Sequence, residues 1–327
     1  MRHLRLVPDN TKIPFMRMRR WTFPIAALLS LASIVLFIVV GPNYGIDFLG
    51  GTVIEIQTKE QHPDLTALRS KLNALDLGDV QVQTIGDDNS ILIRVGQQAG
   101  GETAQQEAIG KVRAALADQA EFRRTEIVGP RVSGELAWNG ALAMIVTFLA
   151  IAIYVWFRFE WQFAVGSIIS AANVVIMTFG FYVVTQHEFN LTSLAAILTT
   201  VGYSLNDTVV VYDRIRETLR KYKKIPLGDL IDRAINDMLG RTVITTMTTL
   251  IALFSLYIFG GEVIRAFTLA MIFGVCAAIF SSICVAAPVL IYFKLRPDQM
   301  DDKPEEDPSK SAANAMAKQT GKGAQKA

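Results

Sequence analysis

The chain has 327 residues, of which 51% are hydrophobic and 19% charged, and its formal net charge is +2. So small an excess of positive charge does not indicate nucleic-acid binding. The hydrophobic residues are clustered into six runs, each near or above the ~18–20 residues that a bilayer-spanning helix requires. These runs cover residues 21–40, 137–157, 161–185, 191–212, 242–259 and 266–293. The chain is therefore predicted to be a multi-span α-helical membrane protein with six transmembrane helices.

The distribution of Lys and Arg predicts the orientation of the spans. These residues are concentrated in segments 1–20 and 213–240, whereas loops 186–190 and 260–265 contain one Arg and no Lys. Because cytoplasmic loops carry an excess of Lys and Arg, both termini are predicted to be cytoplasmic. The first span, 21–40, is predicted to be a permanent anchor, since no clear small-residue cleavage site follows it.

Residues 41–136 are predicted to form an external, periplasmic domain with its connectors to the membrane. Alternating and amphipathic patterns predict the following elements. They are strand 52–58, helix 63–75, strands 79–84 and 90–95, helix 102–119 and strand 121–128. The βαββαβ order is that of a small α+β ferredoxin-like domain. Asp47, flanked by glycines in segment 45–51, is predicted either to orient the junction with the membrane or to cap a local element.

Residues 137–293 are predicted to form a five-helix transmembrane region. Its charged cytoplasmic loop, 213–240, has apolar residues at helical spacing and is predicted to contain an amphipathic connector helix. Asn173 is predicted to hydrogen-bond to a neighbouring helix. Residues 294–327 contain little that could be buried and are predicted to form a disordered cytoplasmic tail. The chain has two cysteines, both in the last span, so no disulfide framework is predicted.

Asp207, within the fourth span, is the strongest functional candidate. An Asp near a bilayer centre costs roughly 2.5–3.5 kcal/mol, and such residues usually pair or mark an ion or proton path. A polar path along this helix is predicted beside the carboxylate. It consists of Thr199, Thr200, Tyr203, Ser204 and Asn206. The alternative is positional, because Asp207 lies only about five residues from the cytoplasmic end of the span, where thinning and hydration ease the cost.

Arg241 opens the fifth span, with Thr245, Thr248 and Thr249 on its helical face. Two interpretations remain open. The Arg could modulate the charge of an intramembrane carboxylate, or it could snorkel to the interface while each Thr bonds to its own helix.

Motifs for other chemistry are missing from the sequence. There is no phosphate-binding loop of the Walker type and no His clearly inside a span, which argues against ATP hydrolysis, an intramembrane metalloprotease and a Ser-His hydrolase. No cofactor, metal site or enzymatic activity is predicted. An ion gradient is left as the energy source, and one charge moved across 100 mV supplies roughly 2.3 kcal/mol.

Four motifs identify a resemblance to a known family. GIDFLGG (45–51), VGPRVSGEL (128–136), VGYSLNDTVVVYDRIRE (201–217) and GRTVITTMTTL (240–250) occur in this order around a small external domain. Together they resemble the SecF family of the bacterial Sec protein-export machinery, within the resistance-nodulation-division superfamily. The resemblance covers about residues 20–293.

The resemblance implies a location in the bacterial inner membrane and a role in protein export. SecF proteins act with SecD beside the SecYEG channel and use the proton-motive force in late steps of translocation. YajC, the exported polypeptide and membrane lipid are the other partners expected. The membrane Asp and Arg of the family fall on Asp207 and Arg241, which the resemblance therefore implies as the proton-coupling residues.

Two other functions remain as alternatives. One is a small-molecule or lipid exporter of the same superfamily, although such proteins usually have larger external domains and both membrane halves in one chain. The other is a non-transporting scaffold subunit, for which Asp207→Asn would be silent.

Overall fold

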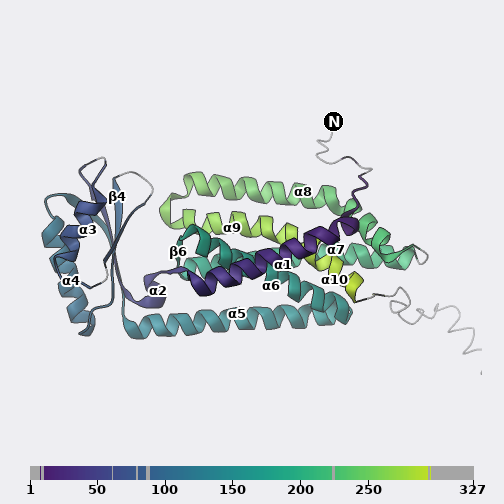
Figure 1. The fold of residues 1–327 in the computed structure, drawn as a ribbon, viewed down its shortest axis with the longest axis horizontal. Coiled ribbons are helices and arrows are strands. Elements are labelled where there is room, and N and C mark those ends of the chain that lie inside the picture. Colours follow the sequence, from purple (N-terminus) through teal and green to yellow (C-terminus); the bar gives the residue numbers. More distant parts are fainter. Residues whose placement is uncertain are drawn as a thin grey trace, which may run out of the picture.

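A computed structural model describes residues 8, 11–60, 62–78, 80–85, 89–222, 225–293 and 295. The described chain forms a bundle of long helices with a small sheet domain beyond one end of it (Figure 1). Helix α1 begins, and the last described helix, α10, ends, at the opposite end of the bundle. The predicted tail, 294–327, lies outside the described residues except for Leu295.

The predicted six spans are confirmed, since six described helices are long and apolar enough to cross a membrane. They are α1 (Phe15–Val39), α5 (Pro130–Arg158), α6 (Trp161–Thr185), α7 (Leu191–Lys221), α8 (Leu227–Phe259) and a last span. The last span combines α9 (Gly261–Ser281), a π-helix η1 (Ser282–Ala286) and α10 (Ala287–Tyr292). Burial separates the helices into two groups. The most apolar windows of α6, α7 and the last span are 44–56% buried, against 6–17% for α1, α5 and α8, so the first group forms the centre of the bundle.

The charged segment 213–240 is part of two long helices rather than a separate connector helix. Its first residues continue α7, and those from Leu227 onward form the first turns of α8, which runs without a break into the fifth span. Leu230 and Ile231 in these turns are fully buried in the bundle core. The start of α1 lies on the same turns, because the Met16 backbone N–H donates to Asp232 Oδ1 at 2.7 Å. The apolar spacing here therefore packs the helix against the bundle.

Two polar features of the spans have local causes. The predicted contact of Asn173 is confirmed, because its Nδ2 donates to Ser30 Oγ at 2.6 Å and joins α6 to α1. The π-helix η1 ends at Ala286, two residues before Pro288. Proline has no N–H and its ring crowds the carbonyl of the preceding turn, so a widened turn is a common way to accommodate it.

The sheet domain has the predicted ferredoxin-like arrangement. Its elements are β2 (Gly51–Thr58), α3 (Leu65–Asn73), β3 (Val80–Thr84), β4 (Ser90–Val95), α4 (Gly101–Leu116) and β5 (Ala120–Val128). The strands lie in the order β3-β4-β2-β5, and every neighbouring pair is antiparallel. Helices α3 and α4 cover the face turned away from the bundle (Figure 1), where Ile54, Ile93 and Leu116 belong to a core separate from that of the bundle.

A short junction joins this domain to the bundle. After α1, residues Asn43–Tyr44 form β1, and residues Ile46–Leu49 form the one-turn helix α2. Strand β1 pairs in parallel with β6 (Glu188–Phe189), which lies between α6 and α7. On the other side of the domain, Gly129 alone separates β5 from α5. Both covalent connections are therefore short.

Candidate functional site

Helix α7 presents two different faces at the centre of the bundle. Three hydroxyl side chains on one face, Thr200, Ser204 and Thr208, are 99% buried. On the other face Thr199 and Asn206 are exposed and Tyr203 is half-buried. Asp207 is half-buried and lies between these faces, because successive residues of a helix are rotated by about 100°. The predicted polar path is thus divided between the interior and the surface of this chain.

Asp207 is hydrogen-bonded to the last span. Ser282 Oγ donates to Asp207 Oδ2 at 2.8 Å, and Ser282 is the first residue of η1. Single π-turns inside α-helices occur frequently at functional sites. Ser282 was not predicted as a site residue, because a serine in an apolar span gives no signal of its own. Its place six residues before Pro288 is the feature that could have indicated a widened turn.

A second hydrogen bond ties the other end of η1 to α7. The Tyr212 hydroxyl donates to the carbonyl oxygen of Ala286 at 3.0 Å, and the Tyr212 side chain is fully buried. Gly166 of α6 lies against this hydroxyl, and a Cβ there would collide with it. Because Asp207 and Tyr212 bond to the first and last residues of η1, the geometry of the π-helix depends directly on α7.

Arg241 lies in a different environment. It is exposed on α8, which packs against α7. Within the part of the chain that the structure describes, its side chain forms no ion pair with Asp207. The fold therefore places the two residues on neighbouring helices without bringing their side chains together.

The threonines of the predicted path bond to their own helices. Each hydroxyl donates to a backbone carbonyl one turn earlier, as in the second interpretation offered by the sequence. The oxygen–oxygen distances are 2.7 Å for Thr199, 2.8 Å for Thr200, 3.0 Å for Thr245, 3.1 Å for Thr248 and 2.9 Å for Thr249. The hydrogen-bonding capacity of these hydroxyl donors is met within their own helices, so they need no ligand.

Ser204 and Thr208 differ from these threonines. Their hydroxyl oxygens are buried and form no hydrogen bond with any residue that the structure describes. Both lie within one turn of Asp207 on the buried face of α7. A buried hydroxyl without a partner is costly, so these two groups are the ones with unused capacity to pass or hold a proton near the carboxylate.

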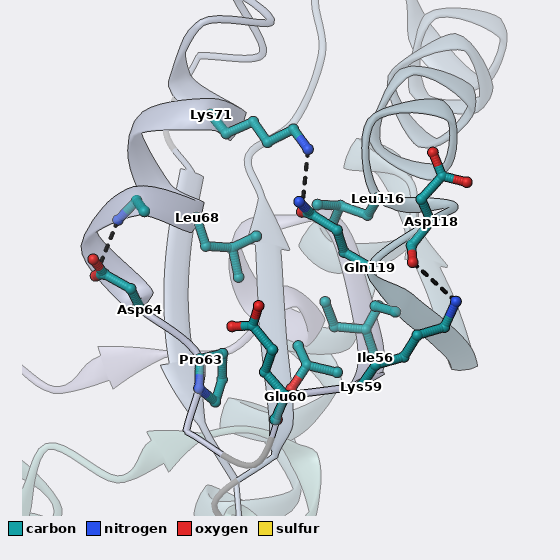
Figure 2. A pocket seen from close by; sticks show the side chains of 13 residues that line it. Ile56, Lys59, Glu60, Pro63, Asp64, Leu68, Lys71, Leu116, Asp118 and Gln119 are labelled. Atoms are coloured by element: carbon teal, nitrogen blue, oxygen red, sulfur yellow. Dashed lines mark hydrogen bonds between the residues drawn. The ribbon is translucent and has the colours of Figure 1, made fainter.

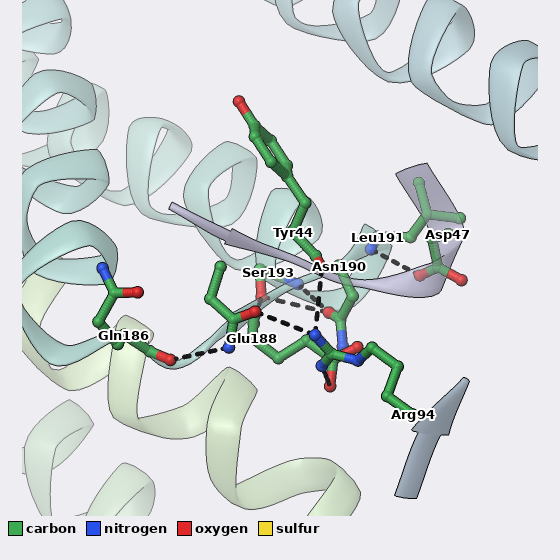
Figure 3. A network of polar contacts seen from close by, with 9 residues as sticks. Tyr44, Asp47, Arg94, Gln186, Glu188, Asn190, Leu191 and Ser193 are labelled. Carbon is green, nitrogen blue, oxygen red and sulfur yellow. Dashed lines mark hydrogen bonds and ion pairs between the residues drawn. The ribbon is translucent and has the colours of Figure 1, made fainter. Parts of the chain in front are cut away.

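Asp47 lies at the opposite end of α7 from this site. Its Oδ2 accepts a hydrogen bond at 2.9 Å from the backbone N–H of Leu191, the first residue of α7 (Figure 3). A carboxylate is favourable at a helix N-terminus, where backbone N–H groups lack partners. Asp207 is 16 residues further along, about 24 Å at 1.5 Å per residue. Asp47 therefore contributes to the junction and not to the surroundings of Asp207.

A cleft of about 360 Å³ lies in the sheet domain beside α3 and α4 (Figure 2). Its floor includes Ile56, Leu68 and Leu116. Two lysines at its rim are already bonded, Lys59 Nζ to the Asp118 carbonyl at 2.9 Å and Lys71 Nζ to Gln119 Oε1 at 3.1 Å.

Among the described residues no group of three or more His, Cys, Asp or Glu side chains could hold a metal ion.

Two family descriptions match the chain. Residues 108–296 match the family described as "Protein export membrane protein SecD/SecF, C-terminal", and residues 35–61 match the "SecD/SecF GG Motif".

Individual relatives agree with these matches. The chain is 41% identical to the protein translocase subunit SecF of Rickettsia felis over 297 residues, covering 90% of this chain and 96% of that protein. It is 44% identical to the protein translocase subunit SecDF of Brucella abortus over 300 residues, covering 92% of this chain and 40% of that protein. The crystal structure of SecDF, a translocon-associated membrane protein from Thermus thermophilus, superposes with a TM-score of 0.81 at 31% identity. The superposition covers 89% of this chain and 40% of that one. The chain thus spans less than half of these SecDF relatives.

Proposed function

Because this chain belongs to the SecD/SecF family of protein-export membrane proteins, we propose that it couples the proton-motive force to late steps of protein translocation. Within the family it is a SecF-type subunit of the Sec translocase, a transport component rather than an enzyme. The observation that carries the proposal is the position of Asp207, a half-buried carboxylate of a central helix bonded to the π-helix of the last span.

Asp207 is proposed to bind and release the coupling proton. An ionised carboxylate only accepts hydrogen bonds, whereas a protonated one also donates. Protonation of Asp207 would therefore change its contact with Ser282, 2.8 Å away, and with it the packing of η1 on α7. Each charge that crosses a potential of 100 mV releases roughly 2.3 kcal/mol, which is comparable to the hydrogen bonds that would be rearranged.

Arg241 is proposed to modulate the charge of Asp207 from the neighbouring helix. One support is that Arg241 lies in the motif GRTVITTMTTL (240–250), which resembles that of SecF proteins. The other is its exposed position on α8, where it is free to respond to a partner or to a shift of the helix. An approaching guanidinium favours the ionised carboxylate. The buried hydroxyl groups of Ser204 and Thr208 form no hydrogen bond with the described residues. We propose that they relay the proton to Asp207.

The SecDF relatives hold the matching region within a longer chain, which implies association of this chain with SecD. We propose that SecD covers the exposed polar face of α7, that the exported polypeptide is the cargo, and that SecYEG and YajC are further partners. The C-terminal ends of α5 and α7 lie at the end of the bundle opposite the sheet domain, and Arg158 and Arg216 lie within the last two turns of these helices. Because cytoplasmic ends are rich in such residues, we place the complex in the inner membrane with both termini cytoplasmic and the sheet domain periplasmic.

The test is export of a secreted protein into inverted membrane vesicles that carry Asp207→Asn, with and without a proton gradient. Asp213→Asn is the matched control, because Asp213 lies on the same helix in an exposed ion pair with Arg158 at 3.3 Å. Such pairs contribute little. We expect Asp207→Asn to remove the gradient-dependent part of export and Asp213→Asn to retain it, at equal protein level and equal co-purification with SecD. Unchanged gradient dependence in Asp207→Asn would favour the scaffold function instead.

A further inference from the structure

We propose that four side chains at the junction, Asn43, Asp47, Arg94 and Glu188, clamp the sheet domain to the first turn of α7. In this view the domain moves as one body with the helix that carries Asp207, rather than swinging on a flexible hinge. We call these four residues the junction clamp. Its role in export rests on the proposed function, whereas its mechanical effect does not.

Arg94 is the part of the clamp contributed by the sheet. It lies on β4, and 92% of its surface is buried. Its Nη2 lies 2.7 Å from Glu188 Oε2, while its Nη1 donates to Asn43 Oδ1 at 2.9 Å and to the Tyr44 carbonyl at 3.3 Å (Figure 3). One guanidinium therefore binds β6 and β1 together. Its planar, rigid fork makes such a multiple contact geometrically specific.

Glu188 and Asp47 carry the connection onward to α7. The Glu188 carbonyl accepts from Ser193 Oγ at 3.0 Å, and Ser193 belongs to the first turn of α7. Asp47 accepts from the backbone N–H of Leu191 at 2.9 Å in the same turn. A movement of the sheet domain away from the bundle would have to break the contacts of Arg94 with Glu188, Asn43 and Tyr44. Glu188 is itself held to the helix start through its carbonyl.

The backbone around the clamp leaves little room for a hinge. A Cβ at Gly45 would lie 2.5 Å from Glu188 Oε1 and 3.1 Å from the Asn190 Cβ, so the two segments are in close contact. The Gly45 N–H also donates to the Phe189 carbonyl at 2.8 Å. On the far side of the domain a single residue, Gly129, precedes the proline that begins α5. Both routes between sheet and bundle are thus short, and the route through Gly45 is also held by direct contacts.

The test measures the distance between the domain and the bundle directly, in the full chain with its SecD partner. Spin labels are placed on cysteines at Gln106 of α4 and Val184 of α6, both exposed, after Cys276 and Cys284 are replaced by Ala. We expect one narrow distance distribution in the parent. Arg94→Gln and Glu188→Gln should each broaden it, and the exchanged pair Arg94→Glu with Glu188→Arg should narrow it again.

The matched control is Arg124→Gln. Arg124 pairs with Glu126 within the same sheet, and both side chains are about half exposed. Among the described residues, neither side chain forms a hydrogen bond or ion pair with the bundle junction. Arg124→Gln should leave the distribution narrow. If Arg94→Gln and Glu188→Gln also leave the distribution unchanged, the clamp does not hold the domain and the proposal is overturned.

Export then separates the clamp from the proton site. With the clamp opened by Arg94→Gln, we expect gradient-dependent export to fall at least several-fold while gradient-independent export is retained. A broadened distribution with unchanged export would refute the mechanical role in coupling, but not the role of Asp207. Conversely, failure of the proton site would appear as normal export by Asp207→Asn with a narrow distribution.

Discussion

Helices α7 and α8 pack against each other, and each carries one charged residue that the sequence singles out for proton coupling. Their surroundings are nevertheless different. Asp207 on α7 has a partner inside this chain, Ser282, at 2.8 Å. Arg241 on α8 is exposed, and within the described residues it has no ion pair with the carboxylate. Of the proposed pair, Asp207 is thus already bonded within this chain. Arg241 is exposed and available to a partner or to another arrangement of the helices.

Small side chains explain why the contacts of α7 are internal. Gly274 of α9 lies against Thr200, and a Cβ at that glycine would come within 2.6 Å of the Thr200 Oγ1. This close approach lets the last span reach the carboxylate with a side chain as short as serine. In α8 only 17% of the most apolar window is buried within this chain, so most of that window is left to contact lipid or a partner.

The largest effect expected from the comparison is that of Arg241→Gln. We expect it to abolish most gradient-dependent export while the midpoint of thermal unfolding stays within about 1–2 °C of the parent. The reason is that the exposed side chain forms no hydrogen bond or ion pair with the residues that the structure describes. Surface substitutions of that kind usually change stability by less than about 0.5 kcal/mol. Vesicle export and thermal unfolding of the purified complex measure the two quantities.

Arg241→Lys is the control for charge. It should retain part of the gradient dependence, because the charge remains although the planar fork is lost. If Arg241→Gln lowers the unfolding midpoint strongly, Arg241 stabilises the fold, and the contrast between the two helices disappears.

An intermediate effect is expected for Ser282→Ala. Hydrogen bonds to charged groups contribute roughly 1.5–3 kcal/mol, so the loss of this donor should reduce gradient-dependent export by about tenfold. The neighbouring Ser281→Ala is the matched control, because Ser281 bonds to Ser170 of α6 and not to Asp207. It should lower stability without changing the gradient dependence. Equal export defects in both variants would mean that general packing of the last span, and not the contact with Asp207, is what matters.

The sequence predicted those features of the fold that depend on local pattern. Apolar runs located the spans, and alternation located the strands of the sheet domain, because burial imposes the periodicity of each element on its residues. Helical spacing on α7 grouped Thr199, Thr200 and Ser204 with Asp207, but it did not show that Thr200 and Ser204 face the interior while Thr199 lies on the surface. The structure of segment 213–240 was harder to predict, because charged residues at the membrane surface are compatible both with a separate helix in the loop and with the ends of two long spanning helices.

The contacts around the candidate site could not be predicted in the same way. Ser282 lies 75 residues from Asp207 in sequence. Likewise, Arg94 lies on strand β4 of the sheet, whereas Glu188 lies on the short strand β6 before α7. Such pairs depend on how elements pack, and a single sequence carries no periodic signal for them. The contacts of the junction clamp therefore follow only from the three-dimensional positions of the side chains, whereas Pro288 gives a local signal for the widened turn of η1.

The smallest expected effects are those of removing one hydroxyl group from α8 and one from α7. Thr248→Val on α8 is expected to be silent in export, because the hydroxyl bonds at 3.1 Å to the Ile244 carbonyl of its own helix and needs no other partner. Ser204→Ala on α7 should reduce gradient-dependent export two- to threefold, since it removes a buried hydroxyl next to Asp207 that the described chain leaves unused. Both are measured as initial rates in the vesicle assay. If Thr248→Val were as harmful as Ser204→Ala, the exposed face of α8 would take part in proton movement, and the internal route along α7 would lose its main support.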